Sequence, residues 1–122
     1  EKKQLRFTNA GHARPLYYRK SSGKMLALDT DGLFVGIKED TEYQEKTLSV
    51  QEGDRLFLYT DGITELKNAN REEFGEKRLA KYIADNSGAD GGAFCDGLIA
   101  EVRAFSGGEA PGDDIAFLDV KF

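Results

Sequence analysis

At residues 55–68 the chain reads RLFLYTDGITELKN, an apolar run that stops abruptly at an acidic turn. The run Leu56–Tyr59 is short and continuous, which is typical of a strand buried on both faces in the middle of a sheet. It is followed by Asp61 and Gly62. A carboxylate at the mouth of a buried strand is costly unless a partner compensates its charge, and the glycine permits a tight bend. The stretch therefore predicts a central strand that ends in a polar site.

A second acidic cluster opens the last apolar segment of the chain. Asp113 and Asp114 precede a strand that we expect over residues 115–122. If this strand and the central strand are antiparallel neighbours, the end of one lies beside the start of the other. Asp61 and Asp113 would then converge at one end of the sheet, and hard divalent cations prefer such carboxylate oxygens. The alternative is a plain acidic α+β domain in which both aspartates only form turns.

Composition narrows the class of protein. The chain has 122 residues, enough for one domain with its own core, with 39% hydrophobic residues, 32% charged residues and a net charge of -5. Lysine and arginine are scattered, so we expect no nucleic-acid partner. No apolar run approaches the ~20 residues of a membrane helix. We therefore expect a cytoplasmic protein, or a cytoplasmic domain of a larger one.

The single cysteine and the single histidine limit the kinds of site that the chain can form. Cys95 is the only cysteine, so an internal disulfide is impossible, and its apolar helical surroundings favour a core position. His12 is the only histidine, which excludes a multi-histidine zinc site. We expect His12 to be a loop residue bonded to neighbouring backbone rather than an acid catalyst. The turn at residues 29–32 is similar to a calcium loop, but Leu33 occupies the next ligand position and argues against one.

Hydrophobic periodicity predicts several strands, then two helices, then a last strand. The expected strands cover residues 5–8, 16–19, 24–28, 43–50, 56–59 and 115–122. The second and third should form a hairpin around Gly23, and the fourth should turn at residues 51–54 into the central strand as a second hairpin.

The two expected helices have terminal signals of their own. The first should begin with a capping box of Asn70 and Glu73 and end near Gly88. The second should begin after Asp90 and end at residues 106–108, where two glycines follow a serine. The order of elements predicts an α+β fold, with a largely antiparallel sheet and a helix pair on one face.

Several stretches occur in the order typical of one protein family. They are Asn9–His12 with Pro15, Gly32–Ile37, Gly53–Gly62 with Glu65 and Asn68, Phe74–Glu76, and Gly112–Ile115. Together they resemble the metal-dependent protein phosphatases of type 2C (the PPM superfamily), in the bacterial sporulation and stress-response branch of the SpoIIE and RsbU kind. The resemblance spans nearly the whole chain. It implies an α-β-β-α sandwich that binds two manganese or magnesium ions and hydrolyses phosphoserine or phosphothreonine.

The resemblance also implies roles for individual residues. Asp61 and Asp113 match the C-terminal metal ligands of the family. Asp114 stands at the adjacent position, where it would support the site, and Gly62 would allow close approach of the backbone. Metal ions supply the activated water in such enzymes, so no catalytic residue beyond the ligands is implied. The substrate implied by the branch is a regulatory phosphoprotein such as an anti-anti-sigma factor.

The sequence departs from the family pattern in its upstream part. Family members carry an upstream Gly-Asp that is followed by a Gly-His-Gly element, and the aspartate of this motif bridges both metals. No Gly-Asp followed by Gly-His-Gly is present here. We therefore expect residues 1–122 to be the C-terminal portion of a phosphatase domain, without the upstream half. This portion should bind metal weakly or not at all and be inactive alone. Uncovered apolar surface and strand edges would favour a homodimer of this portion. The alternative function is that of a non-catalytic, phosphatase-like binding module.

Overall fold

The structure, a computed structural model, describes residues 3–30, 39–40 and 42–122. The whole motif at residues 32–37, with the position Leu33, lies outside the described residues. The strands are β1 (Gln4–Phe7), β2 (Leu16–Arg19), β3 (Lys24–Ala27), β4 (Lys46–Ser49), β5 (Arg55–Tyr59) and β6 (Phe117–Lys121). The helices are α1 (Asp61–Thr64), α2 (Gly75–Asp85) and α3 (Gly91–Ser106). This order confirms the predicted α+β fold.

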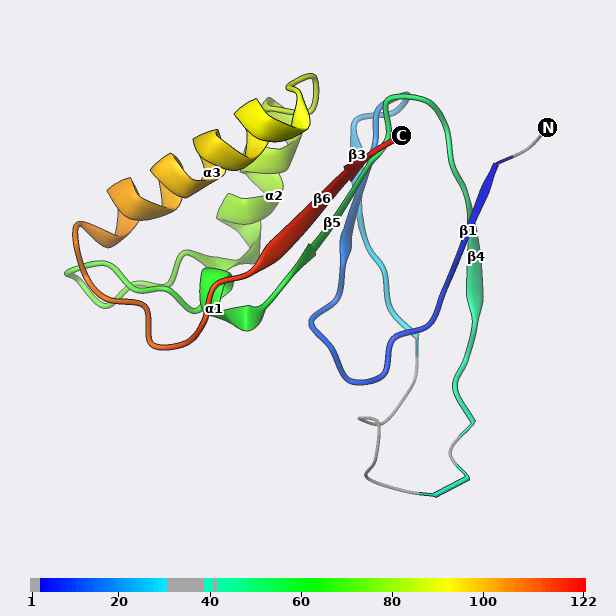
Figure 1. Cartoon of the computed structure of the whole chain (residues 1–122), viewed down its shortest axis with the longest axis horizontal. Coiled ribbons are helices and arrows are strands. Elements are labelled where there is room, and N and C mark those ends of the chain that lie inside the picture. The colour runs from blue at the N-terminus through cyan, green and yellow to red at the C-terminus, as the bar shows by residue number, and fades with distance from the viewer. Residues whose placement is uncertain (1–2, 31–38, 41) are drawn as a thin grey trace.

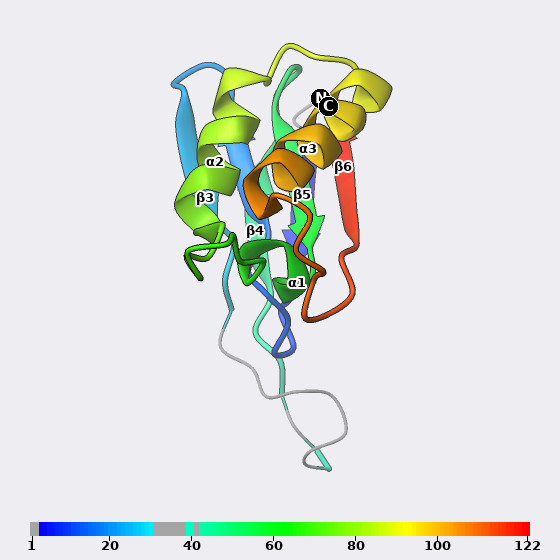
Figure 2. The same ribbon diagram turned by 90° about the vertical axis from the view of Figure 1, so that its left-hand side faces the viewer.

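Four of the strands form an antiparallel main sheet in the order β3-β2-β5-β6. β2 and β3 pair as the predicted hairpin. β5 lies between β2 and β6, so that Phe57 stands opposite Leu16 on one side and Asp119 on the other. Figures 1 and 2 show α2 and α3 together on one face of this sheet. The central position of β5 and the helix pair on one face are therefore as predicted.

β4 does not form the predicted second hairpin with β5. It pairs instead with β1 in a separate two-stranded antiparallel sheet, which Figure 1 shows beside the main sheet. The buried Asp54 lies at the turn where the chain passes from one sheet to the other. Its carboxylate accepts hydrogen bonds from the backbone N–H groups of Lys20 and Gln51, at 3.0 and 3.1 Å, and from the hydroxyl of Tyr17. These bonds tie the turn before β5 to the β2–β3 hairpin and leave β4 to pair elsewhere.

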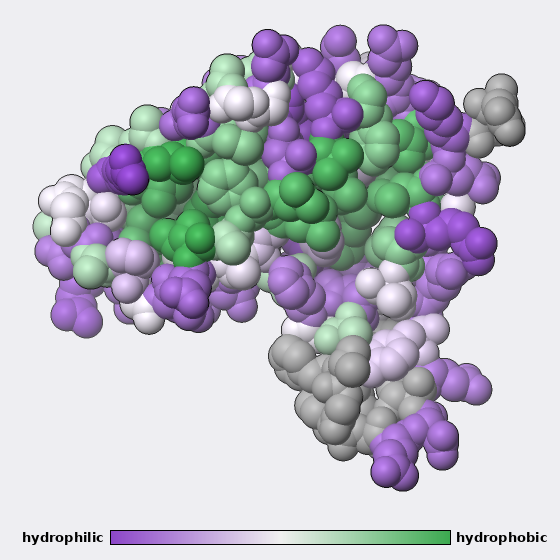
Figure 3. Space-filling model, in the orientation of Figure 1, coloured by the Kyte–Doolittle hydropathy of each residue, from purple (hydrophilic) through white to green (hydrophobic). Residues whose placement is uncertain are grey.

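The two faces of β5 differ in burial, so the prediction of a strand buried on both faces is wrong. The buried residues, which alternate along the strand, are Arg55, Phe57 and Tyr59. Leu56 and Leu58 point to the opposite face, are only half-buried, and line a cavity of about 380 Å³ with residues of β1. Leu118, opposite Leu58 on β6, is 59% exposed. Figure 3 shows hydrophobic residues at the surface where β6 lies in Figure 1.

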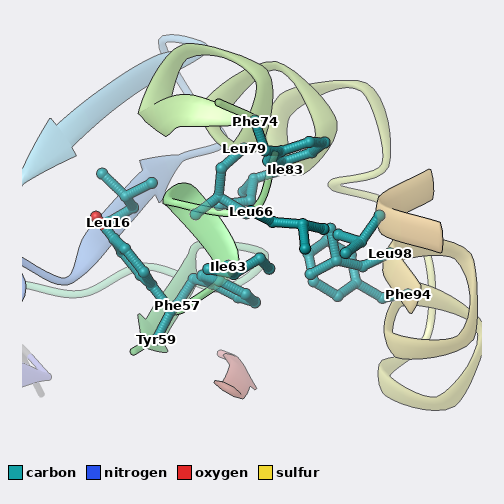
Figure 4. Packing of buried hydrophobic residues seen from close by; sticks show 11 residues of the cluster. Leu16, Phe57, Tyr59, Ile63, Leu66, Phe74, Leu79, Ile83, Phe94 and Leu98 are labelled. Atoms are coloured by element: carbon teal, nitrogen blue, oxygen red, sulfur yellow. The ribbon is translucent and has the colours of Figure 1, made fainter. Parts of the chain in front are cut away.

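The hydrophobic core fills the space between the main sheet and the two long helices, as Figure 4 shows. Its members are Leu16, Phe57, Tyr59, Ile63, Leu66, Phe74, Leu79, Ile83, Phe94, Leu98 and Val102. The periodic apolar residues of both helices supply about half of this cluster, as their spacing predicts. Ile63 and Leu66 come from α1 and the loop behind it, so the residues that follow Asp61 are anchored in the core.

α3 begins and ends where the sequence predicts. Asp90 precedes its first turn, and Gly107 ends it with φ of 60°, a left-handed conformation that glycine adopts without strain. Cys95 packs against the core from this helix. No helix in the described part of the chain is both long enough and apolar enough to cross a membrane.

α2 begins later than the predicted capping box. Asn70 does not cap it. Instead the side chain of Asn68 accepts hydrogen bonds from the backbone N–H groups of Asn70 and Glu72, both at 3.0 Å. These bonds hold the chain in a tight loop, so the helix starts only at Gly75, directly after the buried Phe74.

Candidate metal centre

The acidic residues that follow β5 and those that precede β6 lie at the same end of the main sheet. β5 ends at Tyr59, which stands opposite Phe117, the first residue of β6. Figure 1 shows α1, which begins with Asp61, next to the loop that leads into β6, and Figure 2 shows the same arrangement from a second side. The antiparallel pairing thus brings the chain at Asp61 close to the Asp113–Asp114 segment.

Thr60 links the two segments through hydrogen bonds. Its backbone N–H donates to the carbonyl of Ala116 at 2.9 Å. Its hydroxyl donates to the carbonyl of Asp114 at 2.9 Å, with the Ala116 carbonyl also at 3.3 Å, and accepts from the Ala116 N–H at 3.0 Å. The Thr60 side chain therefore holds the backbone on both sides of Ile115.

Gly62 lies against the same segment. A Cβ at this position would stand 2.3 Å from the carbonyl oxygen of Asp114 and 3.2 Å from that of Asp113. Both neighbours are backbone atoms, which cannot turn aside as the end of a long side chain can. Only glycine allows the two segments to approach this closely.

The two predicted ligands open onto different cavities. Asp113 lines a polar cavity of about 650 Å³, and its Oδ1 accepts a hydrogen bond from the N–H of Asp114 at 2.7 Å. Asp61 lines a smaller cavity of about 380 Å³, together with Arg14. Glu73 lines both cavities, so the two are neighbours at this side chain. The structure brings the two segments together without placing both carboxylates in one cavity.

The cavity at Asp61 is rich in charge. Burial of Tyr59 raises the pKa of its phenol to about 12, and the nearby carboxylates of Glu76 and Asp61 add to the rise. Arg14 supplies positive charge, and its side chain makes no hydrogen bond or ion pair to the described residues. His12 also lines this cavity, but its Nδ1 lies 2.9 Å from the carbonyl of the next residue, as expected for a loop histidine.

The donor chemistry fits a hard divalent cation, although the set of ligands is incomplete. Within residues 3–30, 39–40 and 42–122, no three or more histidine, cysteine or acidic side chains are grouped so that they could hold a metal ion. The carboxylates of Asp61 and Asp113 are exposed and are of the oxygen type that magnesium and manganese prefer. Burial raises the pKa of the Cys95 thiol, so this residue suits the core and not metal binding.

Two features of this site were not anticipated from the sequence. The hydroxyl of Thr60 bridges to the second acidic segment, and Glu73 lies between the two cavities. The sequence does mark Thr60, which stands directly before Asp61 at the end of an apolar strand. It does not show which backbone groups the hydroxyl reaches, because these come from the far end of the chain.

A known family resembles the chain along its whole length. The family described as "Stage II sporulation protein E (SpoIIE)" matches residues 1–122, the full length of the chain. The phosphoserine phosphatase RsbU of Bacillus subtilis (strain 168) is 31% identical over 70 residues, which cover 57% of this chain and 21% of RsbU. The match thus spans about a fifth of that relative.

Solved structures show the same fold at low sequence identity. The SiaA-PP2C domain of Pseudomonas aeruginosa has a TM-score of 0.83 and 21% identity, covering 99% of this chain and 47% of that one. The catalytic domain of the serine/threonine protein phosphatase PstP, solved in complex with two manganese ions, has a TM-score of 0.58 and 15% identity, covering 95% and 52%. The chain belongs to the SpoIIE family, and its fold is that of PP2C phosphatase domains.

Proposed function

We propose that the protein containing this chain is a metal-dependent phosphatase that removes phosphate from serine or threonine of a regulatory protein. The observation that carries the proposal is the junction of the Asp61 and Asp113–Asp114 segments at one end of the sheet, joined by Thr60 and Gly62. Family membership, and the name of RsbU as a phosphoserine phosphatase, support it. The two manganese ions of PstP support a metal-dependent reaction.

In this proposal Asp61 and Asp113 hold manganese or magnesium. Asp114 and Gly62 support the site through the close backbone contact between the two segments. Such ions, when bound, activate a water molecule near neutral pH and neutralise the charge of phosphoryl oxygens. Arg14, which lines the cavity at Asp61 and makes no side-chain hydrogen bond or ion pair to the described residues, can bind an anionic phosphoryl group through its planar guanidinium.

We propose further that residues 1–122 are the C-terminal portion of a phosphatase domain. The match to the SiaA-PP2C domain covers 47% of that chain, which supports this division. The remaining ligands, a bridging carboxylate among them, would come from other residues of the protein. The portion alone would bind metal weakly and be inactive, and the 59% exposed Leu118 on β6 supports its association with a second copy.

The substrate class that we propose is a phosphorylated regulatory protein, such as an anti-anti-sigma factor, in the cytoplasm. The support is the family to which the chain belongs and its similarity to RsbU. A protein substrate also agrees with two neighbouring open cavities, since a phosphorylated segment can extend from one to the other.

Phosphate release tests the proposal. The full-length protein is incubated with a phosphoserine protein in Mn²⁺, in Mg²⁺ and with a chelator. We expect release in at least one metal, loss of release with the chelator, and recovery when the metal is restored. The alternative, a non-catalytic phosphatase-like binding module, predicts that the phosphoprotein binds but that no phosphate is released in either metal.

A further inference from the structure

We propose that Thr60 is a positioning residue of the proposed metal centre, whose hydroxyl holds the Asp113–Asp114 segment beside Asp61. This inference rests on the proposed function and deepens it, because it assigns the control of ligand geometry to a residue that binds no metal. The structure supports it through three observations: the bonds of the hydroxyl, the contacts on either side of Asp61, and the absence of an ordinary capping role.

The hydroxyl of Thr60 makes hydrogen bonds to the backbone of the second acidic segment and of Ala116, once as donor and once as acceptor. It donates to the Asp114 carbonyl at 2.9 Å and accepts from the Ala116 N–H at 3.0 Å. The strand pairing between β5 and β6 ends at Tyr59 and Phe117. Among the described residues, the bond from Thr60 is the hydrogen bond that joins Asp114 to the end of β5. The side chain thus extends the link between the two strands as far as the acidic turn.

Asp61 lies between two residues that both contact the carbonyl of Asp114. Thr60 bonds to this carbonyl, and Gly62 allows it to come within 2.3 Å of where a Cβ would stand. The backbone of Asp61 is therefore fixed relative to Asp114 from both sides. Magnesium binds at 2.0–2.1 Å in near-ideal octahedral geometry, and a functional site must be held to within ~0.5 Å. Loss of one of the two contacts would loosen the ligand pair.

Thr60 does not act as an ordinary helix cap. It occupies the N-cap position of α1 with extended backbone angles (φ -91°, ψ 155°), but its side chain makes no capping hydrogen bond. A threonine at this position usually bonds to an N–H group of the first turn and stabilises the helix by about 1 kcal/mol. Here the hydroxyl turns away from α1 towards β6. Its bonds serve the junction of the two acidic segments and not the helix that it precedes.

Three variants of the full-length protein test this role. Thr60→Val keeps the shape of the side chain and removes the hydroxyl, whereas Thr60→Ser keeps the hydroxyl. Thr47→Val is the matched control, since Thr47 is an exposed residue of β4 in the other sheet. The measurement is the dissociation constant of Mn²⁺, from the electron paramagnetic resonance signal of the free ion. Thermal unfolding without metal shows whether each variant is folded.

We expect Thr60→Val to weaken Mn²⁺ binding by about 10- to 100-fold, the usual effect of losing a group that orients metal ligands. Thr60→Ser should bind Mn²⁺ with a dissociation constant within about threefold of wild type, and Thr47→Val should bind as wild type does. Amide hydrogen exchange gives an independent measurement, because the N–H of Ala116 loses its acceptor only in Thr60→Val.

Each outcome decides a different point. If wild type binds Mn²⁺ and the folded Thr60→Val variant binds it equally well, Thr60 is not a positioning residue while the proposed function stands. If Thr60→Val does not fold, Thr60→Ala takes its place, and equal binding by that variant has the same meaning. If wild type neither binds Mn²⁺ nor releases phosphate, the proposed function fails, and the role of Thr60 fails with it.

Discussion

Arg55 and Asp119 form an ion pair that is buried between the main sheet and the helices. Nη1 lies 2.7 Å from Oδ2, and the two side chains are 0% and 2% exposed. The guanidinium also donates to the carbonyls of Ser87 and Ala89, in the connection between α2 and α3. It lies over the ring of Phe94, 4.1 Å from the centroid. The pair therefore ties the helix pair to the two strands that carry the candidate metal centre.

Removal of one partner should leave an unpaired charge in the core. We expect Asp119→Ala to lower the free energy of unfolding by about 3–5 kcal/mol, because Arg55 then remains buried without its counter-ion. The double variant Arg55→Met, Asp119→Leu buries no charge and should recover most of the loss. Urea denaturation measures both. If Asp119→Ala costs less than about 1 kcal/mol, the buried pair does not stabilise the fold as proposed.

Because of Asp54, the free energy of unfolding should depend on pH in the acid range. Burial by itself raises the pKa of this carboxyl, but the hydrogen bonds from Tyr17 and from the N–H groups of Lys20 and Gln51 outweigh it and lower the pKa. A carboxyl whose folded-state pKa lies below its unfolded value, about 3.9, contributes stability that is complete above that value. This contribution is lost as the pH falls through the folded-state pKa.

We expect Asp54→Asn to be less stable than wild type at neutral pH, and the difference to shrink on acidification. Urea denaturation at several values from about pH 7 to about pH 3 measures it. Asp96→Asn, at an exposed position of α3, is the control and should follow the wild-type curve. A constant difference between Asp54→Asn and wild type over the whole range would contradict the lowered pKa.

Arg71 carries backbone strain that glycine would relieve. Its φ is 61°, in the left-handed region, within the loop that Asn68 organises. The left-handed conformation costs a side-chain residue roughly 1–2 kcal/mol, more than the entropy that glycine loses on folding. We expect Arg71→Gly to raise the free energy of unfolding by about 0.5–1 kcal/mol. Arg103→Gly, in α3, should lower it by about 1 kcal/mol, and equal effects of the two would refute the strain.

Gly62 and Gly92 are a matched pair for the close contact of the two acidic segments. A Cβ at Gly62 would overlap the backbone of Asp114, whereas nothing lies within 4 Å of a Cβ at Gly92. We expect Gly62→Ala to cost about 1–3 kcal/mol of stability through overpacking and to weaken metal binding. Gly92→Ala in α3 should be neutral or stabilising by up to about 1 kcal/mol. If the denaturation midpoints of Gly62→Ala and Gly92→Ala were similar, the contact at Gly62 would not be tight.

Much of the fold could be predicted because the relevant signals are local. The β2–β3 hairpin, the central apolar run and the ends of α3 each depend on residues that lie close together in the sequence. The pairing of β4 with β1 and the late start of α2 could not be predicted in this way. Asp54 and Asn68 decide them through hydrogen bonds to particular backbone groups, and periodicity does not show these bonds.

The candidate site shows the same limit. The placement of Asp61 and Asp113 at strand mouths indicated that the two segments would meet, since antiparallel neighbours bring an end beside a start. The cavities that the two carboxylates line also contain residues from other parts of the chain. The sequence therefore predicted that the two acidic segments meet, whereas the hydrogen bonds of Thr60 and the two separate cavities could be found only in the structure.

The most direct test of the account is the turnover of a phosphoserine protein by full-length Asp61→Asn and Asp113→Asn at saturating Mn²⁺. Asparagine keeps the volume of the side chain but loses the charge that binds a divalent cation. We expect both variants to stay folded and to lose about 100-fold or more of their phosphate release, while Asp96→Asn retains it. Turnover of Asp61→Asn and Asp113→Asn within about twofold of wild type would contradict the assignment of these residues as metal ligands.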